Sequence, residues 1–104
     1  MSENKYNVQV SETAAKMLVD HSAFLATVNE EAADRLTDSF EAAADSLQEN
    51  PQRCPWFKRD EVPAKKYRFL LFEKRYMLIF QVCDKNVYVD YVLDCRQDYS
   101  WLLN

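Results

Sequence analysis

The chain has 104 residues, of which 48% are hydrophobic and 29% charged. This composition excludes a disordered chain, and the length favours one domain over residues 1–104. The net charge of −4 conceals an asymmetry, because residues 1–50 carry three basic and ten acidic side chains, whereas residues 51–104 carry ten and seven. An overall acidic protein is repelled by nucleic acid, so a free polyanion is disfavoured as its main ligand, although the basic half could contact one locally.

Cysteine spacing and hydropathy exclude several other classes of protein. Cys54, Cys83 and Cys95 form no CxxC pair and have no histidine nearby, so we expect neither a disulfide framework nor a metal site, and no cofactor. No apolar run reaches the roughly 18 residues that a membrane span needs, and residues 1–8 lack the apolar region of a signal peptide. The sequence therefore predicts a cytoplasmic protein without a membrane partner or a small-molecule substrate.

The first half of the chain predicts a short strand followed by two helices. Residues 6–10 alternate apolar and polar side chains, and Ser11 and Asn29 are suitable N-caps for the two helices. The apolar stripes that follow have helical spacing: Ala14, Leu18, His21, Leu25 and Val28, then Ala33, Leu36, Phe40, Ala43 and Leu47. The join is short, so the helices form an antiparallel hairpin. We expect His21, the only histidine, to pack against its helix neighbours without reaching the face of the sheet that the helices leave uncovered.

The second half predicts three strands, within residues 67–72, 76–82 and 87–93, after an irregular connection rich in proline. The chain has no glycine, so Asn, Asp or Lys must adopt positive φ in the hairpin turns, and Asn86 is the best candidate. The order β-α-α-β-β-β predicts an α+β fold in which the helical hairpin covers one face of an antiparallel sheet.

Alternation along the strands divides this sheet into two faces. We expect Phe69, Phe80 and Val89 to form the core beneath the helices. The opposite face would carry a mixed set that suits binding better than contact with solvent: Arg68, Leu70, Met77, Ile79, Tyr88 and Asp90.

This order of elements resembles the RelE/ParE superfamily of toxins from type II toxin-antitoxin systems. The segments that carry the resemblance are LxxNPxxCPW after the second helix, KYRFLLF, YMLIFQVCDKNVYVDYVL and the terminal DCRQDYSWLL. Such toxins are held inactive by a cognate antitoxin, which implies an antitoxin as partner here. Some members cleave mRNA on the ribosome, whereas ParE-like members poison DNA gyrase.

The resemblance also implies site residues. A ribosome-dependent mRNA interferase would use Arg68, Arg96 and Tyr99 as catalytic residues, with Lys65 or Lys66 supplying further charge. Leu70 and Met77 stand where that branch has cations, so the sequence favours the ParE-like branch and inhibition by binding. The partner-binding residues would then be Arg68, Leu70, Met77, Tyr88, Arg96 and Trp101. A third alternative is a silent member that only binds its antitoxin.

Overall fold

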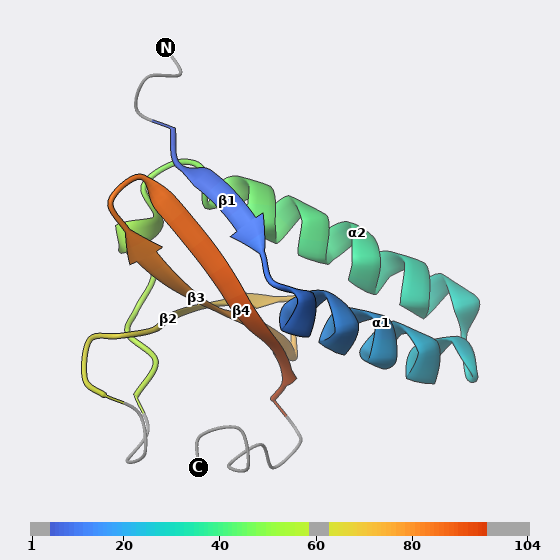
Figure 1. The fold of residues 1–104 in the computed structure, drawn as a ribbon. Helices are drawn as coiled ribbons and strands as arrows, with labels where there is room; N and C mark the ends of the chain where they lie inside the picture. Colours follow the sequence, from blue (N-terminus) through green and yellow to red (C-terminus); the bar gives the residue numbers. More distant parts are fainter. Residues whose placement is uncertain (1–4, 59–62, 96–104) are drawn as a thin grey trace.

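The computed structural model describes residues 5–58 and 63–95. Its elements follow the order β1 (Asn7–Val10), α1 (Glu12–Ala26), α2 (Glu30–Ser46), the short 3-10 helix η2 (Pro51–Arg53), β2 (Arg68–Phe72), β3 (Tyr76–Cys83) and β4 (Asn86–Asp94). The strands form one sheet in the order β1-β4-β3-β2, and the two helices run side by side as a hairpin (Figure 1). The predicted α+β class and the predicted order of elements are therefore confirmed.

Local sequence signals start both helices where they were predicted to start. The Ser11 side chain accepts a hydrogen bond from the Ala14 N–H at 3.0 Å, and the Asn29 side chain accepts one from the Glu31 N–H at 2.9 Å. These bonds satisfy backbone donors that have no partner inside the first helical turn. The Ser11 hydroxyl also donates a hydrogen bond to the Asp90 carbonyl oxygen at 3.2 Å. This bond fixes the start of α1 against β4.

The sheet is mixed rather than wholly antiparallel. The pairs β2–β3 and β3–β4 are antiparallel as predicted, whereas β1 pairs with β4 in parallel, with Val8 opposite Val87 and Val10 opposite Val89. The alternation of a four-residue strand shows which side chains share a face, but it carries no information about strand direction. The expectation of a fully antiparallel sheet is wrong in this respect.

A β-bulge in β4 changes which side chains share a face. Phe80 pairs with Val89 and Ile79 pairs with Tyr91, so Asp90 has no partner in the register. The extra residue shifts the alternation, because two successive residues of the bulged strand then oppose one residue of its neighbour. Val87, Val89 and Val92 consequently belong to the cluster under the helices, whereas Tyr91 and Leu93 belong to the other face.

The main core lies between the helical hairpin and one face of the sheet. Leu36 and Leu47 of the helical segment are fully buried there, together with Leu78 and Phe80 of β3. Phe69 was predicted in this core, but it lies on the opposite face, and Leu70 packs under the helices in its place. The register confirms the exchange, since Leu70 pairs with Leu78.

The turns adopt positive φ without glycine. Glu73 (φ 49°) and Lys74 (φ 70°) do so between β2 and β3, and Asp84 (φ 56°) does so between β3 and β4. The prediction for Asn86 is wrong, because Asn86 pairs with Cys83 and begins β4. Aspartate tolerates the left-handed region for the same reason as asparagine, since its short polar side chain bonds locally.

Candidate functional site: the second face of the sheet

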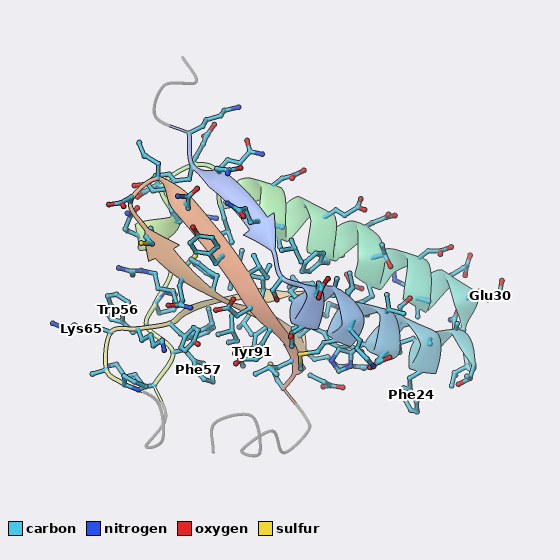
Figure 2. The ribbon with its side chains drawn as sticks, viewed as in Figure 1. Phe24, Glu30, Trp56, Phe57, Lys65 and Tyr91 are labelled. Carbon is cyan, nitrogen blue, oxygen red and sulfur yellow. The ribbon has the colours of Figure 1, made fainter. Side chains whose placement is uncertain are left out.

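The face of the sheet opposite the helices, here called the second face, carries its own aromatic and apolar cluster. Met77, Ile79 and Leu93 are buried in it, and Tyr67, Phe69 and Tyr91 are partly buried around them. Phe57 joins this cluster from the connection after α2, and its ring meets the Phe69 ring edge-on at 6.3 Å. Figure 2 shows Phe57 and Tyr91 on the same side of the sheet.

One end of the second face is polar. Gln81 donates a hydrogen bond to the Asp90 carboxylate at 2.7 Å, and the rings of Tyr67 and Tyr91 lie 6.2 Å apart. Burial raises the pKa of the Tyr67 hydroxyl, and the neighbouring Tyr91 and Asp90 add to the increase. Tyr88, opposite Gln81 in the register, is exposed at 36%. Three tyrosines and one carboxylate therefore gather where β4 is bulged.

Arg68 does not lie on the second face. It pairs with Phe80 of the helix-covered face, and its Nη1 donates hydrogen bonds to the carbonyl oxygens of Cys54 (2.6 Å) and Gln52 (3.1 Å). The guanidinium also stacks on the Trp56 ring, 3.7 Å from its centroid. This geometry fixes the connection after α2 against β2, a role that suits the planar fork of arginine.

Main-chain hydrogen bonds complete this attachment. The Phe57 N–H donates to the Tyr67 carbonyl at 2.7 Å, and the Phe69 N–H donates to the Pro55 carbonyl at 3.1 Å. The segment from Pro55 to Phe57 thus covers part of the outer edge of β2 and brings the Phe57 ring onto the second face. A covered edge is protected against pairing with other chains.

The structure separates the residues that the sequence had grouped as a binding face. Met77, Ile79 and Tyr88 lie on the second face as expected, and Asp90 occupies its bulge. Placing Arg68 and Leu70 there was wrong, because both share the face of Leu78 and Phe80. Arg96, Tyr99 and Trp101 lie outside the described residues.

His21 does not reach the second face, as predicted, but contacts the helix-covered face of the sheet. Its Nε2 lies 3.0 Å from the Val92 carbonyl of β4, and its ring meets the Tyr76 ring at 5.4 Å. Both neighbours belong to the helix-covered face, so His21 joins α1 to the sheet on the side away from the tyrosines.

Phe57, Tyr67 and Tyr91 were not among the residues predicted for the second face. Alternation along β2 groups Tyr67 with Phe69 but does not show which face the helices cover, and alternation along β4 gives no sign of the bulge that turns Tyr91 to the second face. The aromatic pair Trp56–Phe57 was the one available signal, since two adjacent large rings in a loop need separate places to pack.

The described residues contain no group of three metal-binding side chains from among His, Cys, Asp and Glu. Within residues 5–58 and 63–95, neither helix has the length and apolar character needed to cross a membrane.

Comparison with known proteins places this fold in a family. A family model described as the ParE toxin of the type II toxin-antitoxin system, parDE, matches residues 8–99. The chain belongs to the ParE toxin family. This ParE-family chain is also similar to a solved structure titled "Chromosomal ParDE TA system from P. aeruginosa", with a TM-score of 0.71 and 16% identity over 88% of this chain and 98% of that chain. At that identity the likeness concerns the fold. No curated protein sequence matches significantly.

Proposed function

We propose that this ParE-family protein, a toxin component of a type II toxin-antitoxin system, stops growth by binding a cellular target. DNA gyrase is the target that we propose first, and the second face of the sheet is the surface that we propose binds it. A cognate antitoxin would neutralise the protein in the cytoplasm, as part of a module that stabilises a plasmid.

The observation that carries this proposal is the chemistry of the second face. Catalysis of RNA cleavage requires cations at the scissile phosphate and a positioned acid or base. Among the described residues, the second face presents Tyr67, Tyr88 and Tyr91 beside buried Met77 and Ile79, and the cation next to them is Lys66, whose Nζ lies 5.3 Å from the Tyr67 ring centroid. Tyrosine combines a large apolar ring with a polar hydroxyl and is enriched at the centres of protein interfaces.

The position of Arg68 supports binding over cleavage. Its Nη1 already donates to two backbone carbonyls and its plane lies against Trp56. Moving this guanidinium to a phosphate would break those bonds and release the connection after α2, which costs stability at the moment of binding.

Growth of a bacterial culture after induction of the isolated gene tests the proposal. We expect the unmodified protein to stop growth, and Tyr88→Ala to relieve the arrest because it removes an exposed ring from the second face. Phe24→Ala is the matched control, since Phe24 is an exposed aromatic residue of α1, 67% accessible, at a distance from that face.

Two outcomes would contradict the proposal. Unimpaired growth on induction, with the folded protein present, would indicate a member that only binds its antitoxin. Growth arrest accompanied by cleavage of mRNA on ribosomes would indicate an interferase. Co-expression of the protein encoded by the adjacent gene should restore growth if that protein is the antitoxin.

A further inference from the structure

The β-bulge in β4 turns two successive side chains towards the second face. Val89 belongs to the helix-covered face, whereas Asp90 accepts a hydrogen bond from Gln81, which shares the face of Ile79. Tyr91 belongs to the cluster of the second face and marks this place in Figure 2. In a regular strand, two adjacent side chains point to opposite faces. The bulge therefore puts a carboxylate and an aromatic ring side by side on the second face.

Asp90 is a half-buried carboxylate that forms no ion pair within the part of the chain that the structure describes. The Gln81 amide donates to one of its oxygens, Oδ2, at 2.7 Å. Because a carboxylate only accepts, the amide nitrogen of Gln81 faces it, and the carbonyl oxygen Oε1 remains an acceptor. Residues 5–58 and 63–95 supply no hydrogen-bond donor to Asp90 Oδ1 or to Gln81 Oε1.

Tyrosine rings flank these two acceptors. The rings of Tyr67 and Tyr91 lie 6.2 Å apart. Burial raises the pKa of the Tyr67 hydroxyl most, and the further increases from Tyr91 and Asp90 show that the three side chains are neighbours. Tyr88 shares their face and is exposed at 36%. Lys66 Nζ lies over the Tyr67 ring, 5.3 Å from its centroid, so this ring already attracts a cation.

We infer that these side chains form a binding site for an arginine of a protein partner. The site, here called the arginine site, comprises Tyr67, Gln81, Tyr88, Asp90 and Tyr91. The guanidinium donates to Asp90 Oδ1 and to Gln81 Oε1 and lies against a tyrosine ring. Arginine fits because its planar fork carries several donors and stacks on aromatic rings, whereas the ammonium of lysine is compact and strongly hydrated. The inference rests on the proposed function only in taking the second face as an interface.

The charge of Asp90 decides between this occupant and others. An apolar surface laid over the second face would bury the carboxylate without a partner, which is unfavourable. The phosphates of nucleic acid or lipid, and the carboxylates of an acidic peptide, are repelled by it. The tyrosines by themselves would accept many apolar or aromatic groups, so the carboxylate is the feature that restricts the site to a cation.

Three capped tripeptides are the probes, each with one glycine on either side of arginine, lysine or citrulline. Citrulline has nearly the shape of arginine but carries no charge. Binding to the full-length protein is measured by NMR titration of backbone and side-chain amides at low salt. We expect the arginine peptide to shift the side-chain amide of Gln81 and the backbone amides of Tyr88 and Asp90. The lysine peptide should bind about threefold more weakly, and the citrulline peptide at least about tenfold more weakly.

Two matched pairs of variants test the residues of the site. Asp90→Asn removes the charge but keeps an oxygen that accepts from Gln81, and it should weaken binding of the arginine peptide about fivefold or more. Asp38→Asn makes the same change at an exposed position of α2 and should alter binding less than about twofold. Tyr88→Leu should weaken binding about two- to fivefold, whereas Tyr88→Phe, which keeps the ring, should not. Thermal unfolding of the four variants verifies that they are folded.

The peptides need neither gyrase nor growth arrest, so their binding is independent of the proposed target. Binding of the arginine peptide at Asp90 by a protein that leaves growth unimpaired would support this inference and contradict the proposed function. Equal affinities for the arginine and citrulline peptides, equal effects of Asp90→Asn and Asp38→Asn, or signal changes that map away from the arginine site would each overturn the inference.

Discussion

Replacement of Arg68 by alanine is the change for which the structure makes its most specific prediction. We expect Arg68→Ala to destabilise the protein substantially, because its guanidinium holds the connection after α2 against the sheet through Cys54, Gln52 and Trp56. If Arg68 instead projected freely towards a ligand, its removal would scarcely change the stability of the folded state.

The size of the effect follows from the individual contacts. The partly buried bond to the Cys54 carbonyl contributes about 1.5 kcal/mol, and the more exposed bond to Gln52 about 0.5 kcal/mol. Stacking on Trp56 adds about 0.5–1 kcal/mol. Because neighbouring contacts are not additive, we expect a loss of about 2 kcal/mol in the free energy of unfolding, and a fall of about 10 °C in Tm.

Urea denaturation followed by tryptophan fluorescence, together with thermal unfolding by circular dichroism, measures this loss. Arg68→Lys should recover little of it, because lysine keeps the charge but lacks the planar fork. Lys16→Ala is the control for loss of a surface cation, since the Lys16–Asp20 ion pair (3.4 Å) is largely exposed and contributes at most about 0.5 kcal/mol. A loss below about 0.5 kcal/mol for Arg68→Ala would refute the reasoning.

Three further substitutions or reactions test other parts of the structure. Ser11→Ala removes the N-cap bond to the Ala14 N–H and should lower the free energy of unfolding by about 1 kcal/mol; an unchanged denaturation midpoint would contradict the capping role. Leu36→Ala, at a fully buried position, should cost about 2–5 kcal/mol, and a loss under about 1 kcal/mol would show that the hairpin packs differently. Burial raises the pKa of the Cys54 thiol and outweighs the opposite effects of Arg53 and Arg68, so a smaller fraction of this thiol is ionised at pH 8. Iodoacetamide should therefore modify the exposed Cys83 before the buried Cys54, as followed by mass spectrometry. Faster labelling of Cys54 would be inconsistent with its burial.

Local signals in the sequence were sufficient for the starts of both helices, although Val28, predicted in the apolar stripe of the first helix, lies beyond its end and is 80% exposed. Ser11 and Asn29 mark helix starts by a mechanism that involves only the next few residues, and the buried Leu36, Phe40 and Leu47 follow the helical period. The division of the sheet into two faces failed in β2, where Phe69 and Leu70 exchange faces. It also failed in β4 beyond Val89, because the bulge at Asp90 depends on pairing with β3 and on the contact with Ser11. Neither contact is visible in alternation along a single strand.

Only part of the candidate site was predicted, because alternation along a strand does not show the contacts that a strand makes with other segments. Met77 and Tyr88 lie on the second face as the alternation indicated, whereas Arg68 was assigned there from a pattern that ignored the connection after α2. The partners of Arg68 are backbone carbonyls at least fourteen residues away, and backbone acceptors leave no mark in a sequence.

The central claim is that the protein inhibits growth by binding a target through the second face, with no cleavage of RNA. Supercoiling of relaxed plasmid by purified DNA gyrase, with increasing amounts of the purified protein, tests it most directly. We predict that the unmodified protein and Phe24→Ala abolish the supercoiled product, and that Tyr88→Ala does so only at much higher concentration. Undiminished supercoiling in the presence of the folded protein would contradict the claim.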